Sequence, residues 1–281
     1  MTKFANNMKT AALLGLMFGL ILLIGLPWGK QGLTIAFIAG GLMNVIVFFF
    51  SDKIALASMG AQEVNEQTAP DLITMIRRLS QNAGIPMPRV YICPQEAPNA
   101  FATGRSPRKA AVAVTRGALS LLNYEELEGV MAHELAHVKN RDTLISCLAA
   151  TIAGAISYLG HMAFFFGAPR GNSNEGGNPL GAIGSILLLI LAPIAAALIQ
   201  FAISRSREYV ADADGAAIAG TPNGLASALR KLHSVSRRVP MGHEMPAFNH
   251  LFIVQPLNGE TLASLFSTHP PIEKRIEKLL G

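Results

Sequence analysis

Residues 123–142 read NYEELEGVMAHELAHVKNRD and predict a single helix. Asn123 is a favourable N-cap, and Glu126 follows three residues later, which is the spacing of a capping box. Lys139 lies in the last turn, where a positive charge interacts favourably with the helix dipole. These local signals place the start of the helix at Asn123 and its end at Asn140.

The same helix contains His133-Glu134-Leu135-Ala136-His137, an H-E-x-x-H pattern. Residues four apart lie on one face of a helix, so both imidazoles can reach one Zn²⁺. Glu134 lies to the side of that pair, where its carboxylate can contact a water at the metal rather than the metal itself. The alternative is a surface helix with two solvated histidines.

A catalytic zinc site needs a third protein ligand and an open position. Glu208 is the candidate ligand, and Asp212 follows four residues later on the same helix face. In this interpretation Glu208 binds the metal, while Asp212 accepts a hydrogen bond from a ligand histidine and fixes its tautomer. The alternative is a solvated, charged start of a helix, formed together with Arg205 and Arg207.

The composition indicates a membrane protein. Of the 281 residues, 51% are hydrophobic and 15% are charged, whereas about a quarter are charged in a typical soluble domain. Four runs contain no charged residue, namely 10–29, 31–51, 143–169 and 176–204. Each is long enough for a bilayer-spanning helix, which needs roughly 20 apolar residues. The composition therefore excludes a fully soluble protein and a disordered one.

We expect four transmembrane helices in two hairpins. The first pair is joined by a turn at 27–32 and stays in the membrane, because no A-x-A site of a cleaved signal peptide follows the first run. The second pair is joined by a Gly- and Asn-rich turn at 167–179, and its alternative is a buried helical pair that does not cross the bilayer. The expected divisions are a hairpin at 1–51, a polar block at 52–142, a hairpin at 143–204 and a polar block at 205–281.

Positive charges near the span ends predict the orientation of the chain. Seven lie on the side of the N-terminus and both polar blocks and two on the other side: Lys3, Lys9, Lys53, Lys139, Arg141, Arg205 and Arg207 against Lys30 and Arg170. By the positive-inside rule, the polar blocks, both termini and the metal site are cytoplasmic. The net charge of +5 fits an anionic lipid surface, and no basic stripe interleaved with aromatic residues indicates a nucleic acid.

The polar blocks predict a small α+β domain. We expect an amphipathic helix at 71–82, strands at 88–93 and 110–115, and a turn at 105–108. These strands would form a small sheet with an exposed edge near 99–103, on which a substrate segment can bind as an extra strand. The alternative for 99–103 is a plain surface loop.

The chain as a whole resembles the HtpX-type membrane metalloproteases. The resemblance covers nearly its full length: two apolar runs, the H-E-x-x-H helix, two further apolar runs, and then Glu208-Tyr209-x-Ala211-Asp212. Shorter segments also match, namely Asn99-Ala100-Phe101, Asn140-Arg141-Asp142, and Ser267-Thr268-His269-Pro270 followed by Arg275. No metal-binding position departs from the pattern of the family.

The resemblance implies a zinc-dependent endopeptidase of the bacterial inner membrane, with one zinc per chain. Its implied task is the stress-induced removal of misfolded or damaged membrane proteins, and self-cleavage is implied as well. The implied fold class is a mainly α integral membrane protein with four transmembrane helices and a cytoplasmic α+β, zincin-like protease domain. A relative of the CAAX-processing proteases is the alternative, although these usually have more spans and a longer chain.

The chemistry that these residues suggest is metal-assisted peptide hydrolysis with Glu134 as the general base. The oxyanion needs a donor besides the metal. Asn99, His269 and Arg275 are the candidates for it, and a capping role or a surface ion pair is the alternative for each. A non-catalytic metal-binding scaffold would have no use for Glu134. A transporter is disfavoured because the four apolar runs contain no Asp, Glu, Lys or Arg.

Overall fold

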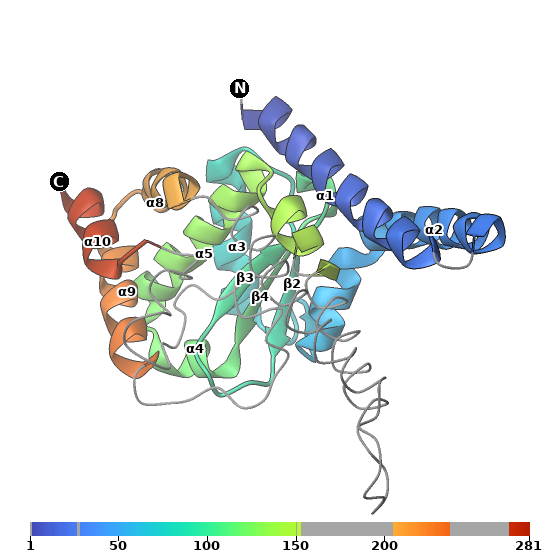
Figure 1. Cartoon of the computed structure of the whole chain (residues 1–281). Helices are drawn as coiled ribbons and strands as arrows, with labels where there is room; N and C mark the ends of the chain where they lie inside the picture. Colours follow the sequence, from blue (N-terminus) through green and yellow to red (C-terminus); the bar gives the residue numbers. More distant parts are fainter. Residues whose placement is uncertain (1, 27–28, 150, 153–204, 237–269) are drawn as a thin grey trace, which may run out of the picture.

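A computed structural model of the chain describes residues 2–26, 29–149, 151–152, 205–236 and 270–281 (Figure 1). Most of the predicted third span, all of the fourth, the turn expected at 167–179, and His269 lie outside the described residues.

A four-stranded sheet forms the centre of the described domain. Its strands are β1 (Gln62–Val64), β2 (Arg89–Cys93), β3 (Ala100–Thr103) and β4 (Ala111–Thr115), in the order β1-β2-β4-β3. The pair β2–β4 is parallel, and the other two pairs are antiparallel. The expected strands at 88–93 and 110–115 are confirmed, and residues 100–103 form an edge strand rather than a loop. All four residues of β3 are buried, whereas the sequence predicted an exposed edge. The short strand β1 was not predicted.

Both faces of the sheet are covered. Successive residues of a strand point to opposite sides, so β4 contributes side chains to two different cores. On one face, Val112 and Val114 of β4 pack in the same core as helices α3 (Pro70–Ala83) and α5 (Tyr124–Asn140). On the other face, Ala111 and Ala113 pack in a separate core. That core includes the C-terminal end of helix α2 (Gly29–Ser58).

The helix α5 has the ends that the sequence predicts. Its Glu126 N–H donates to the Asn123 side chain, and the Asn123 N–H donates to the Glu126 side chain, which completes the capping box. At the other end Arg141 has φ 61°, a left-handed conformation that closes the helix, and the Asp142 N–H donates to the His137 carbonyl. The helix therefore ends at Asn140, three residues after the second histidine.

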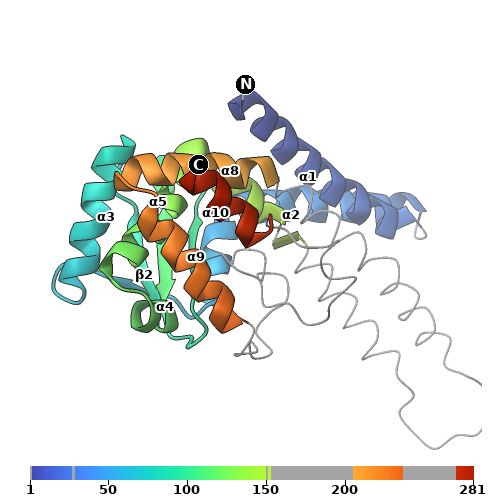
Figure 2. The ribbon, with the colours of Figure 1, turned by 90° about the vertical axis from the view of Figure 1, so that its left-hand side faces the viewer.

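Two further helices pack beside α5 and a third packs on both of them, and Figure 2 shows the three together on one side of the domain. They are α8 (Arg205–Ala219), α9 (Asn223–Ser236) and α10 (Ile272–Leu280), while the short helix α4 (Arg116–Leu121) follows β4. Glycine permits the closest approach to α5. A Cβ atom at Gly129 of α5 would lie 2.3 Å from the Leu225 backbone nitrogen of α9.

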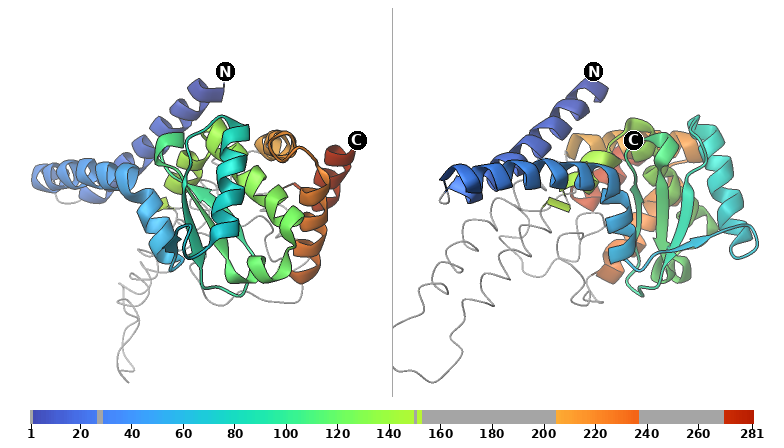
Figure 3. Two further views of the ribbon diagram at one scale, coloured as in Figure 1. Left: turned by 180° about the vertical axis from the view of Figure 1, so that it is seen from behind. Right: turned by 90° about the vertical axis from the view of Figure 1, so that its right-hand side faces the viewer.

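Two long helices, α1 (Thr2–Gly25) and α2 (Gly29–Ser58), extend away from the sheet, while the last turns of α2 lie beside it (Figure 3). Among the described residues, α2 alone is long and apolar enough to cross a membrane, and Met8–Gly19 is a shorter apolar stretch. Residues 143–149 are helical and pack against both α1 and α2, through Ile145 and Leu148. Four spans and the domain divisions therefore stay predictions.

Candidate metal centre

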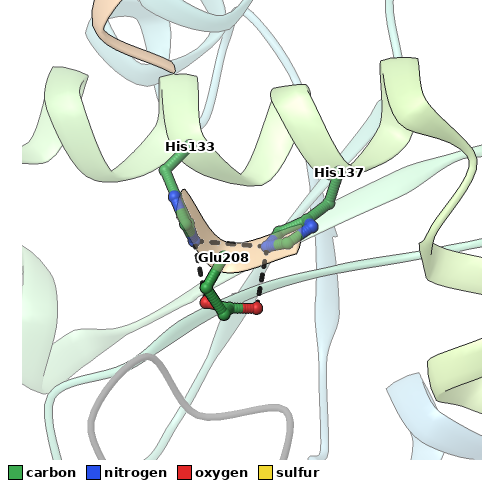
Figure 4. A group of neighbouring side chains, drawn as sticks. All are labelled: His133, His137 and Glu208. Carbon is green, nitrogen blue, oxygen red and sulfur yellow. Dashed lines mark hydrogen bonds and ion pairs between the residues drawn. The ribbon is translucent and has the colours of Figure 1, made fainter. Parts of the chain in front are cut away.

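Three candidate ligands meet in the interior of the domain. His133 and His137 project from one face of α5, and Glu208 projects toward them from α8 (Figure 4). The Nε2 atoms of the two histidines are 3.2 Å apart. Glu208 Oε2 lies 3.7 Å from Nε2 of His133, and Oε1 lies 3.6 Å from Nε2 of His137.

These separations fit a tetrahedral zinc site. Two donors bound at about 2.0–2.1 Å to one tetrahedral centre are about 3.3 Å apart. Each of the three measured separations lies within a few tenths of an ångström of that value. All three side chains are also largely shielded from water, since 2% of the His133 side chain, 16% of His137 and 5% of Glu208 is exposed. The donor set of two imidazoles and one carboxylate is typical of a catalytic zinc.

The close packing of α8 against α5 determines where Glu208 lies. Glu208, Asp212 and Gly215 follow one another on one face of α8, at helical spacings of four and three residues. A Cβ atom at Gly215 would lie 2.9 Å from the Cα atom of His133. Glycine at this position thus lets the backbone of α8 approach the helix that carries the histidines.

The outer nitrogen of His133 faces a carboxylate, as the sequence predicts. Asp212 Oδ1 lies 3.0 Å from His133 Nδ1, and Arg275 of α10 donates to both carboxylate oxygens of Asp212, at 2.9 and 2.6 Å. Burial alone would raise the pKa of Asp212. The hydrogen bonds from Arg275 and His133 outweigh it and hold this pKa at about 2. Asp212 is therefore a carboxylate that faces Nδ1 of His133, while Nε2 of the same ring faces Glu208 and His137.

A second carboxylate, Asp142, supports the other histidine. Its Oδ2 lies 3.3 Å from His137 Nδ1, and its Oδ1 accepts a hydrogen bond from Arg207 at 3.1 Å. Burial alone would lower the pKa of His137, but Asp142, Glu208 and Glu134 together raise it to about 9. No role for Asp142 was predicted from the sequence. The available signal was an aspartate directly after the predicted end of the helix, five residues beyond the second histidine.

Glu134 lies between α5 and the edge strand β3. Its side chain is buried, and its carboxylate accepts a hydrogen bond from the backbone N–H of Ala102. Burial raises the pKa of Glu134 above its ordinary value, and the two neighbouring histidines only partly oppose this. A carboxylate with a raised pKa is suited to accept a proton and to release it again at neutral pH.

Comparison with known proteins identifies the family. A family model described as Peptidase family M48 matches residues 66–281. The chain belongs to peptidase family M48. It is 55% identical over 280 residues to a Protease HtpX homolog of Desulfatibacillum aliphaticivorans, covering 98% of this chain and 89% of that one. A Protease HtpX homolog of Sulfurihydrogenibium sp. (strain YO3AOP1) is 53% identical, with coverage of 98% and 95%.

Among solved structures, the M48 chain is similar to S. mikatae Ste24p. The TM-score is 0.51 at 19% identity, and the match covers 99% of this chain and 66% of the Ste24p chain. At this identity the similarity supports the fold alone. The family and the HtpX relatives confirm the expectation of a membrane-associated metalloprotease that resembles HtpX.

The three candidate oxyanion donors of the M48 chain have different positions. Asn99 is buried immediately before β3, and its backbone N–H donates to the Thr115 hydroxyl at 2.8 Å. Arg275 is fully buried and binds Asp212, with its Nη1 3.9 Å from Glu208 Oε2. His269 lies outside the described residues. Arg275 thus binds the carboxylate that faces His133. The identity of the oxyanion donor stays a prediction.

Replacing Asp142 with asparagine is expected to weaken zinc binding by about 10–100-fold, the usual effect of losing the outer partner of a ligand histidine. The neutral amide can still fill the space beside His137, but it no longer favours a proton on Nδ1. Competition with a chelator measures the dissociation constant for zinc.

Asp214→Asn is the matched control. Asp214 lies on α8 and accepts a hydrogen bond from Asn140, but it contacts none of the three candidate ligands. We expect its zinc affinity to stay within about twofold of the unmodified chain, because only the supporting partner of a ligand changes affinity by the larger factor. Equal affinities for both variants would exclude a positioning role for Asp142.

Proposed function

We propose that this chain is a zinc-dependent endopeptidase with one zinc per chain, bound by His133, His137 and Glu208. The observation that carries the proposal is the set of three largely buried donors at separations of 3.2, 3.6 and 3.7 Å, next to a buried glutamate. A purely structural zinc site closes the coordination shell with a fourth protein ligand. Among the described residues, the metal-ligand group has three members, which leaves a position for a reacting molecule.

Bound zinc would polarise the scissile carbonyl and make a neighbouring water more acidic. Glu134 takes the proton from the attacking water and later delivers it to the departing amine. Its raised pKa favours the protonated state that the second step needs. The Ala102 N–H holds the carboxylate beside the histidines and limits its rotation.

The outer edge of β3 is the proposed binding site for the substrate backbone. In an antiparallel pair, alternate residues direct their N–H and C=O groups toward the partner strand. The Thr115 N–H donates to the Asn99 carbonyl at 2.9 Å, so Ala100 directs its N–H and C=O away from β4, and Ala102 directs its C=O outward while its N–H faces Glu134. A substrate strand paired there would pass Glu134. Because backbone pairing demands little of the side chains, it suits a peptidase that acts on many unfolded proteins.

Within this proposal, Arg275 is a positioning residue. Two of its nitrogens bind Asp212, which in turn faces His133 Nδ1. Asn99 and His269 remain the proposed candidates for the donor to the oxyanion. The buried position of Asn99 next to β3 supports its candidacy, because β3 is the proposed substrate strand.

The proposed setting is the bacterial inner membrane, with four spans and with both termini and the metal centre on the cytoplasmic side. Support comes from the apolar helix α2 and from the packing of α1, α2 and the start of the third predicted span in one apolar cluster. Exposed apolar side chains along α2, such as Ile35, Phe37 and Leu42, suit contact with lipid. The proposed substrates are misfolded or damaged membrane proteins, cleaved under stress.

Removal of the metal tests the proposed reaction. The purified chain in detergent should cleave an unfolded membrane protein, lose this activity with a zinc chelator, and regain it when zinc is restored. We expect a loss of about 100-fold or more, because the metal takes part in the chemical step. Metal analysis should find one zinc per chain before chelation.

Other outcomes point to the alternatives. Bound zinc without cleavage of any unfolded protein would favour a metal-binding scaffold. Cleavage confined to prenylated C-terminal peptides would favour a CAAX-type processing enzyme. Cleavage that a chelator leaves unchanged would rule out the metal mechanism.

A further inference from the structure

A strongly basic turn connects β3 and β4. Residues 105–109 read RSPRK and contain three cations, and residues 97–124 include no Asp or Glu. Elsewhere in the described chain, Arg77, Arg78 and Arg89 pair with carboxylates. By contrast, no ion pair within the described residues involves a cation of residues 105–109. We call residues 105–109 the basic turn.

Close packing at Gly104 and a 3₁₀ turn restrict the backbone of the basic turn. The preceding Gly104 has φ 120°, and a Cβ atom there would lie 2.4 Å from the carbonyl oxygen of Lys109. A 3₁₀ turn covers Pro107–Lys109, and the Lys109 N–H donates to the Ser106 carbonyl at 2.9 Å. The backbone that carries the exposed cations Arg108 and Lys109 is therefore already ordered. Binding by these side chains would cost little additional backbone freedom.

One contact places the basic turn at the end of the apolar part of α2: the Arg105 guanidinium lies 4.6 Å from the centre of the Phe49 ring. Lys53 belongs to α2 itself, four residues beyond Phe49, and its ammonium lies 5.2 Å from the centre of the Phe50 ring. The uncharged run before this point, 31–51, would be about 31 Å long as a helix at 1.5 Å per residue. This length matches a bilayer core of about 30 Å.

A second contact joins Gly104, directly before the basic turn, to a different predicted span. The hydroxyl of Thr143 donates to the carbonyl of Gly104 at 2.8 Å, and Thr143 is the first residue of the third uncharged run. The basic turn thus lies at the level where the apolar sequence of two predicted spans meets the polar domain. Headgroup phosphates occupy this level in a bilayer.

We propose that the basic turn, together with Lys53, binds the phosphates of anionic phospholipid headgroups. The inference rests on the proposed membrane location of the chain. Its basis is the charge complementarity of Arg105, Arg108, Lys109 and Lys53 with an anionic leaflet, at a fixed position beside the end of α2. A single residue separates the basic turn from the end of β3. Headgroup binding therefore also sets the distance between the membrane surface and the outer edge of β3, which lies next to Glu134.

A lipid titration of the full chain in neutral detergent micelles tests this site. Phosphatidylglycerol should raise the temperature of unfolding in a saturable manner. Phosphatidylcholine, and inorganic phosphate at the same concentration, should not. In the triple variant R105Q/R108Q/K109Q, the phosphatidylglycerol concentration for half of the effect should rise about a hundredfold, since each basic residue near an anionic surface contributes about fivefold in affinity.

Two further variants keep the result interpretable. R108Q/K109Q alters only exposed side chains, so it should fold normally and shift the midpoint by about tenfold or more. Arg116→Gln removes an exposed cation at the opposite end of β4 and should behave like the unmodified chain. Zinc content, measured for each variant, reports correct folding.

Three results would overturn the proposal. The first is an unchanged phosphatidylglycerol concentration for half of the effect in R108Q/K109Q. The second is an equal rise in the temperature of unfolding with phosphatidylcholine. The third is an equal rise with inorganic phosphate, which would indicate a site for free anions. The measurement involves no cleavage. Failure of the headgroup site is therefore distinguishable from failure of the proposed peptidase activity.

Discussion

Replacing Glu134 with glutamine is expected to lower the turnover number by about 10²–10⁴-fold, the usual contribution of a general acid–base group. The amide has nearly the same shape as the carboxylate but cannot accept the proton of the attacking water. The separations between His133, His137 and Glu208 involve no atom of Glu134, so one zinc per chain should stay bound.

Cleavage kinetics and metal analysis on the same preparation separate the two parts of this expectation. Glu128→Gln is the matched control, because Glu128 lies on the same helix and pairs with Arg78 at the surface. It should cleave at the normal rate. Normal turnover in Glu134→Gln would exclude Glu134 as the base, whereas loss of zinc would reassign it to the support of the metal site.

Glu208→Ala is expected to abolish stable zinc binding. In structural sites with four ligands, an apparent binding free energy of about 10–16 kcal/mol corresponds to about 2.5–4 kcal/mol for each ligand, so removing one should cost about 10²-fold or more in affinity. Activity should fall in parallel. The two histidines that remain share one helix face and cannot enclose the ion from the side of α8.

Competition with a chelator gives the zinc affinity of this variant, and Asp214→Ala on the same helix is the control. The control removes a carboxylate that accepts a hydrogen bond from Asn140 rather than one that faces the histidines. Its zinc affinity should be nearly normal. One tightly bound zinc per chain in Glu208→Ala would remove Glu208 from the ligand set.

Local patterns allowed much of the fold to be predicted from the sequence. The capping box at Asn123 and the cation in the last turn predicted the extent of α5 to within a residue, because these signals act within one turn of helix. The amphipathic pattern at 71–82 likewise predicted α3 (Pro70–Ala83). In contrast, β1 has three residues, which is too short for a pattern of alternation to be recognised.

The sheet shows where sequence patterns were insufficient. The strands near 88–93 and 110–115 were expected, but not that they pair in parallel, with β3 on the outside of β4. Strand pairing depends on contacts between residues far apart in the chain, which no local pattern specifies. This pairing leaves the outer edge of β3 next to Glu134.

By itself, the sequence determined the helix that carries both histidines, their shared face, the four uncharged runs and the resemblance to a protease family. These features depend on neighbours within one turn of helix or on composition. The tertiary structure decided which groups surround the histidines: it brings Asp142 to His137, Arg207 to Asp142 and the buried Arg275 to Asp212. The reason is physical. A charged group is stable in the interior only beside a partner of opposite charge. Here that partner comes from another helix or from the residues that follow the end of α5.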